Sequence, residues 1–347
     1  MKVSIVGGGG LVGSSAAYSL QCSGKVSQIC LIDANHEAAQ GHAYEMLNAS
    51  SLTSDIRVFA GSMADIADTD IVVITAGLRR KPDESRLDLI HRNVDLFLSL
   101  LSEVTKAGLR KSAYLIVVSN PVDVLTYLAV QRSGLPWQRV LGLGTQLDTA
   151  RFRGNLGQLL NVPPSQVHAL ILGEHGDSMV PIWSSASING LPLTQWPGYT
   201  PALGAKAFED TKTAGATLIK LKGGSSMAVG HSIREVVESI ADDSRRILPV
   251  STLQLGLYGV RDVCLSVPTI VGCGGCRQQI QLNLLPKEQQ GLQQSARVLR
   301  EIIDQVESRI GRVRADTGIV PEANLRPRGN AVPTPIQRSI PRSAWGK

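Results

Sequence analysis

IVGGGGLVG, residues 5–13, is the stretch that decides the fold of this 347-residue chain. It continues an apolar run, Val3–Val6, that is typical of a buried strand. Gly8, Gly10 and Gly13 then satisfy the G-x-G-x-x-G pattern. Glycine lets the backbone turn tightly and approach a pyrophosphate at the N-terminus of the next helix. The stretch therefore predicts a strand, a phosphate-binding loop and a helix, in that order.

An acidic residue follows this unit at the spacing that a dinucleotide requires. Asp33 ends a second apolar run, Ile29–Ile32, and comes twenty residues after Gly13. A carboxylate there binds a ribose diol and repels a 2′-phosphate, so NAD is favoured over NADP. The alternative is a glycine turn followed by a helix-capping aspartate. Because strand, loop, helix and acid occur in this order, dinucleotide binding is the stronger interpretation.

Strands and helices continue to alternate through the first part of the chain. Ile71–Ile74 and Tyr114–Val118 are short apolar runs typical of buried parallel strands. Between them, apolar residues recur at helical spacing: Ile90, Val94, Phe97, Leu101 and Val104. The fold class predicted for residues 1–143 is therefore α/β, a Rossmann-type doubly wound parallel sheet.

The second part of the chain is less regular. Helical patterns lie at 206–221, 231–246 and 286–311, and β-like runs lie at 167–172 and 263–271. This mixture predicts a second, α+β domain over residues 144–316. Residues 317–347 are proline-rich and basic, and a disordered or loosely draped tail is expected there.

Composition narrows the class of protein. Hydrophobic residues make up 43% and charged residues 18%, as in a soluble globular protein. No apolar run approaches the roughly 20 residues of a membrane span, and the N-terminal run is too short for a signal peptide. Five cysteines at irregular spacing suit a reducing cytoplasm. Much of the net charge of +6 falls in 317–347, so the charge gives no reason to expect a nucleic-acid partner. No membrane partner is expected without a long apolar run, and no metal is expected because the CxxC at Cys273 and Cys276 has no second pair.

Two arginines follow the strand-like run Ile71–Ile74. Arg80 and Arg86 lie in GLRRKPDESR, residues 77–86, where an α/β protein handles its ligands. Guanidinium donors match a carboxylate bidentately. On these residues alone, a solvated basic loop is the simpler interpretation.

His175 is the histidine best placed for chemistry, because glycines flank it after an apolar run. Histidine exchanges protons near neutral pH, and a carboxylate must orient it. Asp148 is a better partner than Glu174 or Asp177, whose side chains would point away from their sequence neighbour. Arg151 would share a helix face with Asp148. Taken alone, a turn histidine and a surface Asp/Arg pair are the simpler interpretation of these residues.

Together these segments resemble the lactate/malate dehydrogenase family over roughly residues 1–312. The motifs that carry the resemblance are IVGGGGLVG, LID, ITAGLRRKPDESR, VVSNPVD, LDTARFR, LGEHGDS and LPVS. The resemblance implies a cytoplasmic, NAD-dependent oxidoreductase that interconverts a small L-2-hydroxy acid and its 2-oxo acid by hydride transfer. It also implies a homodimer or homotetramer.

The resemblance assigns roles to residues. His175 would be the acid/base, Asp148 its partner, and Arg86, on a closing loop, would polarise the substrate carbonyl. The substrate would further contact Arg80, Arg151, Asn120 and Ser225. The cofactor would contact Gly8, Gly10, Val12, Gly13, Asp33, Gly77, Val118 and Asn120.

The substrate prediction rests on Arg80. Malate-specific members carry arginine at this position and lactate-specific members carry glutamine, so malate/oxaloacetate is the expected pair. A charge-assisted hydrogen bond to the second carboxylate would contribute about 1.5–3 kcal/mol. The rest of the chain is closer to the lactate branch, which makes L-lactate dehydrogenase the alternative. A more distant alternative is a non-catalytic NAD-binding scaffold.

Overall fold

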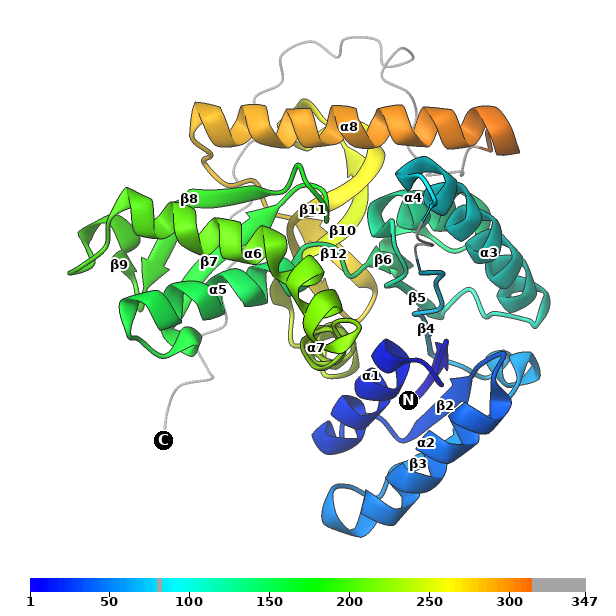
Figure 1. Ribbon diagram of the computed structural model, residues 1–347. Coiled ribbons are helices and arrows are strands. Elements are labelled where there is room, and N and C mark those ends of the chain that lie inside the picture. Colours follow the sequence, from blue (N-terminus) through cyan, green and yellow to red (C-terminus); the bar gives the residue numbers. More distant parts are fainter. Residues whose placement is uncertain (80–82, 314–347) are drawn as a thin grey trace, which may run out of the picture. The chain divides into compact units, whose positions relative to one another are not determined.

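The computed structural model describes residues 1–79 and 83–313. The predicted tail, residues 317–347, lies outside the described residues, as does Arg80. In the described part, a large nine-stranded sheet is flanked by helices (Figure 1). A second sheet of three strands is joined to it by a bridge between Gly173 and Ser266. No helix in the described ranges is long and apolar enough to cross a membrane.

Six parallel strands form the first part of the large sheet, in the order β3-β2-β1-β4-β5-β6. The strand order reverses between β1 and β4, which is where doubly wound sheets bind ligands. The predicted Rossmann-type fold is therefore confirmed. The strands are β1 (Lys2–Val6), β2 (Gln28–Ile32), β3 (Arg57–Ala60), β4 (Ile71–Ile74), β5 (Tyr114–Val117) and β6 (Val140–Gly142).

Helices cover both faces of this sheet, which explains why its central strands are apolar without alternation. Val72 and Ile74 of β4 belong to one core with α3 and α4, whereas Ile71 and Val73 belong to another with α1 and α2. The predicted apolar face of α3 is buried, as expected. The helices are α1 (Leu11–Ser23), α2 (His36–Ala49), α3 (Arg86–Lys106) and α4 (Val122–Arg132).

The second half extends the large sheet and adds the small one. β10, β11 and β12 pair antiparallel, and β10 joins β6 through Ser251 and Gly142. The small sheet runs β7-β8-β9. The elements are α5 (Gln146–Leu160), β7 (Val167–Leu172), β8 (Val180–Ile188), β9 (Leu191–Pro192), α6 (Pro201–Lys222), α7 (Met227–Ala241), β10 (Arg246–Leu255), β11 (Arg261–Gly272), β12 (Gly275–Gln279) and α8 (Pro286–Ile310).

One predicted helix was too long. The pattern at 231–246 continues past the end of α7 at Ala241, and Arg246 already begins β10. Asp243 and Arg245 adopt left-handed backbone, with φ of 46° and 55°, which a right-handed helix cannot contain. The helix therefore ends before them.

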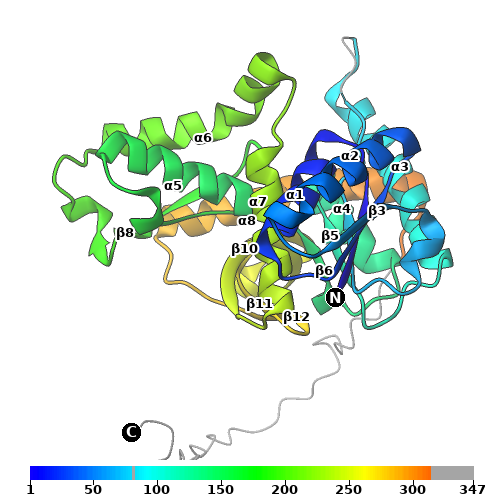
Figure 2. The ribbon, with the colours of Figure 1, turned by 90° about the horizontal axis from the view of Figure 1, so that it is seen from below.

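The loop between β1 and α1 requires its glycines. Gly7 has a φ of +93°, and a Cβ there would lie 2.6 Å from the amide nitrogen of Ala76. A Cβ on Gly13 would lie 2.2 Å from the Gly7 carbonyl oxygen. Helix α7 lies directly beside α1 (Figure 2), because Gly230 has no side chain to separate them. These contacts bring segments from both halves of the chain to the glycine loop.

Candidate active site

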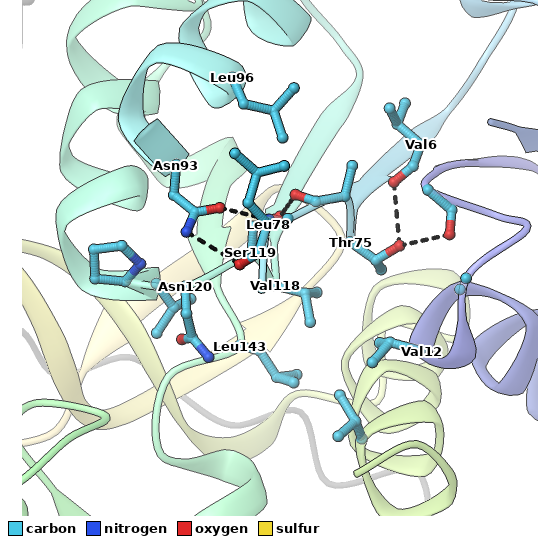
Figure 3. A pocket seen from close by; sticks show the side chains of 18 of the residues that line it. Val6, Val12, Thr75, Leu78, Asn93, Leu96, Val118, Ser119, Asn120 and Leu143 are labelled. Atoms are coloured by element: carbon cyan, nitrogen blue, oxygen red, sulfur yellow. Dashed lines mark hydrogen bonds between the residues drawn. The ribbon is translucent and has the colours of Figure 1, made fainter. Parts of the chain in front are cut away.

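A cavity of about 1510 Å³ opens at the carboxyl ends of β1, β4 and β5. Figure 3 shows Val12, Val118 and Asn120 among its lining side chains. Most residues assigned from sequence line it: Gly10, Val12, Gly13, Asp33, Gly77, Arg86, Val118, Asn120, Arg151, His175 and Ser225. Gly8 and Asp148 are not part of the lining. The structure thus brings most of the predicted site together.

The cofactor end of the cavity is built by the glycine loop and Asp33. The Asp33 carboxylate accepts hydrogen bonds from the backbone N–H groups of Gly9, at 2.9 Å, and Asn35, at 2.9 Å. Gly8 faces β2 instead, since a Cβ on it would lie 2.9 Å from Leu31. Gly8 therefore allows close packing of loop and strand.

Helix α1 begins as an open anion site. Its N-cap, Gly10, offers no side-chain hydrogen bond, and its first turn holds no acidic residue. The first backbone N–H groups of a helix have no partner within the helix, and the helix dipole favours negative charge there. Together with Asp33 at the neighbouring strand end, these residues fit a dinucleotide.

His175 and Asp148 form the central pair. The turn after β7 carries His175, and Asp148 is fully buried in the first turn of α5. His175 Nδ1 lies 2.5 Å from Asp148 Oδ2. Burial lowers the pKa of His175, but the carboxylates of Asp148 and Asp123 outweigh it, so the pKa is raised overall. With Nδ1 engaged, Nε2 is the nitrogen left for a substrate.

The other oxygen of Asp148 orients Arg151, three residues along the same helix. Arg151 Nη1 lies 3.2 Å from Asp148 Oδ1, and its Nη2 lies 3.4 Å from Ser225 Oγ. One carboxylate therefore holds both the imidazole and a guanidinium. The Arg151 side chain remains 14% exposed, enough to meet a ligand in the cavity.

Arg86 is the first residue of α3, capped by Ser85, and does not lie within a loop as the sequence resemblance implied. Its Nη1 lies 2.7 Å from Asp177 Oδ2, and its Nη2 lies 3.9 Å from Glu174 Oε1. The Arg86 side chain is 63% exposed, so this pair contributes only about 0–1 kcal/mol. Arg86 can therefore exchange Asp177 for a ligand at little cost.

Two further polar residues were not singled out in the sequence. Asn93, on α3, accepts a hydrogen bond from Leu78 N–H at 2.8 Å and donates to the Leu78 and Leu89 carbonyls at 3.4 and 3.1 Å (Figure 3). Asp123, on α4, accepts from the His175 N–H at 2.8 Å. The one signal for Asn93 was a polar residue on the buried face of an apolar helix pattern.

Family models match both halves of the chain. The model for the lactate/malate dehydrogenase NAD-binding domain matches residues 1–142, and that for the alpha/beta C-terminal domain matches residues 145–310. The chain belongs to the lactate/malate dehydrogenase family. It is therefore an NAD-dependent oxidoreductase of this family.

Curated relatives carry the name L-lactate dehydrogenase. One from Synechococcus sp. is 40% identical over 307 residues, covering 88% of this chain and 99% of the relative. One from Gloeobacter violaceus is 39% identical over 315 residues, covering 88% and 94%. The solved minor L-lactate dehydrogenase of Enterococcus mundtii superposes with a TM-score of 0.84 at 36% identity, covering 88% and 98%.

These relatives correct the substrate prediction. Malate was predicted from the single residue Arg80, which lies outside the described residues. Sequence similarity along almost the whole family region instead leads to proteins named L-lactate dehydrogenase. The prediction of malate as the preferred substrate was therefore wrong, because one side chain was given more weight than the remainder of the chain.

Proposed function

We propose that the protein is an NAD-dependent L-lactate dehydrogenase that interconverts pyruvate and L-lactate. The observation that carries the proposal is the Asp148 carboxylate, which holds His175 with one oxygen and Arg151 with the other. A proton donor and a carboxylate-binding guanidinium are the two groups that a 2-oxo acid requires. The names of the relatives support pyruvate as that acid.

The proposed mechanism assigns one task to each group. Arg151 binds the substrate carboxylate through its forked donors. His175, protonated and held by Asp148, gives its proton to the carbonyl oxygen as that oxygen becomes negative. Arg86 leaves Asp177 and polarises the same carbonyl, which stabilises the developing charge. NADH, when bound, supplies the hydride.

The remaining predicted residues would bind the cofactor and close the site around the substrate. Asp33 would bind the adenosine ribose, and the backbone at Gly10 and Gly13 would hold the pyrophosphate. Val12, Gly77 and Val118 would line the nicotinamide end, with Asn120 and Ser225 beside the substrate. A NAD-binding domain at 1–143 and a catalytic domain at 144–316 belong to the same proposal.

Steady-state assays with NADH test the substrate directly. Pyruvate should give a kcat/KM at least tenfold above that for oxaloacetate, measured at equal pH and enzyme concentration. NADPH replaces NADH in a parallel assay and should support little turnover, because Asp33 repels the 2′-phosphate. A higher kcat/KM for oxaloacetate than for pyruvate would refute the proposed substrate.

Asn93 should support the reaction without touching the substrate. Asn93→Ala leaves the Leu78 N–H without its acceptor and frees the backbone at Leu78, which lines the same cavity as Arg86. We expect kcat/KM for pyruvate to fall about tenfold, since displacement of a positioned group costs catalysis more than binding. NADH affinity, measured by fluorescence titration, should stay within threefold of wild type.

Asn155→Ala is the matched control for this variant. Asn155 is on α5, outside the cavity lining, and its Nδ2 donates to Ala207 O and Thr211 Oγ1. The Asn155→Ala variant therefore loses comparable hydrogen bonds away from the site, and its kcat/KM for pyruvate should equal that of wild type. Equal kcat/KM values in the two variants would contradict the role given to Asn93.

We also propose that the protein is a cytoplasmic homodimer or homotetramer. Exposed apolar side chains support self-association: Tyr18 on α1, Tyr44 and Leu47 on α2, and Met227 on α7. Five free cysteines suit a reducing compartment.

A further inference from the structure

Asp123 is a buried carboxyl group next to the reacting histidine. It lies in the first turn of α4 and is only 2% exposed. Its Oδ2 accepts the backbone N–H of His175 at 2.8 Å, across a separation of 52 residues. This bond fastens the turn that carries the imidazole to helix α4.

The other oxygen of Asp123 has no hydrogen bond within residues 1–79 and 83–313. Asp123 Oδ1 and the Ser251 hydroxyl oxygen, on β10, are both buried, and neither has a hydrogen-bond partner among the described residues. Burial raises the pKa of Asp123 to about 7. The Ser251 hydroxyl, which is near Asp123 without forming a hydrogen bond of normal geometry, and the His175 N–H both lower that pKa, because their dipoles stabilise the anion. A carboxyl group held in this way has a strong electrostatic influence on its neighbours, because little water screens it.

Charged groups approach His175 from several elements. Asp148 and Arg151 face it from α5, and Asp123 faces it from α4. Glu174 precedes it in the same turn and faces Asp123, and the Cys264 thiol faces Asp123 from β11. Asp148 already orients the ring through Nδ1, so Asp123 is the second carboxylate whose charge favours the imidazolium.

Building on the proposed lactate dehydrogenase function, we propose that Asp123 is a positioning residue for His175. Its hydrogen bond fixes the main chain of His175, and its negative charge stabilises the protonated imidazole. Asp148 provides orientation from one side and Asp123 provides charge from another. Pyruvate reduction needs the protonated imidazole, so Asp123 extends the reaction to higher pH.

Asp123→Asn removes the negative charge of Asp123 while keeping a side chain of nearly the same shape. The carboxamide keeps an oxygen that can accept the His175 N–H, and it removes the negative charge. We expect the alkaline limb of kcat/KM for pyruvate to move down by about one pH unit, a roughly tenfold loss at a pH above the wild-type limb. The acid limb of kcat/KM for lactate oxidation should also move to lower pH, because the protonation state of His175 controls the reaction in both directions.

Glu238→Gln is the control for loss of a buried carboxylate. Glu238 is 8% exposed, pairs with Arg234 on α7 and lies outside the cavity lining. Its pH profile should match wild type. A merely structural role for Asp123 would lower stability in Asp123→Asn and leave both limbs of the profile where they are.

Ser251→Ala tests the same idea with the carboxyl group in place. Loss of the hydroxyl makes the Asp123 anion less favourable, so the limbs should move in the same direction by a smaller amount. If Asp123→Asn does not fold, Ser251→Ala tests the proposal by itself. A downward shift of the alkaline limb of its pH–kcat/KM profile supports the proposal, and a pH profile identical to that of wild type overturns it.

Nuclear magnetic resonance titration of the His175 ring gives a readout that does not depend on turnover. The pKa of His175 should be lower in the folded Asp123→Asn protein than in wild type, with no cofactor added. An unchanged His175 titration in that variant overturns the inference, even if the enzyme reduces pyruvate. A wild-type protein that fails to reduce pyruvate refutes the proposed function instead, and the titration still tests Asp123.

Discussion

His175→Ala is expected to lower kcat for pyruvate reduction by about 10³–10⁴-fold. The alanine removes the proton donor and leaves the Asp148 carboxylate buried, with Arg151 as its charged partner. The glycine loop and Asp33 lie at another part of the cavity and keep their hydrogen bonds. NADH affinity, measured by fluorescence titration, should therefore stay close to wild type while steady-state turnover disappears.

His168→Ala is the matched control for this experiment. His168 is on β7, seven positions before His175, with an exposed side chain outside the cavity lining. Its loss should leave kcat and KM unchanged. A His175→Ala enzyme that retained a tenth of wild-type turnover would show that another group donates the proton.

Arg151→Lys should produce the second large effect. Lysine keeps the positive charge but offers a compact ammonium in place of the planar fork, so it cannot bind a carboxylate bidentately. It also lacks the geometry to contact Asp148 and Ser225 together. We expect kcat/KM for pyruvate to fall about 10²–10³-fold, corresponding to about 3–4 kcal/mol of lost transition-state stabilisation. Steady-state kinetics over a wide pyruvate range will measure it.

The same substitution elsewhere provides the comparison. Arg234→Lys changes a guanidinium on α7 that pairs with Glu238 and does not line the cavity. It should alter kcat/KM by less than twofold. If Arg151→Lys behaved like Arg234→Lys, the substrate carboxylate would have to bind another residue.

The sequence predicted those parts of the fold whose signal is local. β4 and β7 have the predicted bounds, and the apolar spacing of α3 matches its buried face. The sequence did not predict β10, because several of the residues that this strand buries are polar. Ser251, Thr252 and Gln254 are all fully buried in it, and Pro249 interrupts the run. A strand that buries polar side chains gives no apolar pattern to detect.

The candidate site shows the same limit. Asp148 could be chosen as the partner of His175 because both lie in motifs with recognisable chemistry. The roles of Asp123 and Asn93 could not be predicted in this way. Both side chains bond to backbone groups, and every residue type except proline has the same backbone N–H, so the sequence does not reveal such partners. Asp177 was considered only for His175, yet it pairs with Arg86, which is 91 residues away.

The shared Asp148 carboxylate has a consequence for which acids the site accepts. Because the buried Asp148 carboxylate contacts both Arg151 and the His175 ring, it fixes the distance between the group that binds the carboxylate and the group that transfers the proton. An acid whose reactive oxygen is on the carbon next to its carboxyl group matches that span, whereas a 3-oxo acid places the oxygen one carbon too far. The choice between 2-oxo and 3-oxo acids therefore depends on the position of Asp148, the group that contacts both side chains.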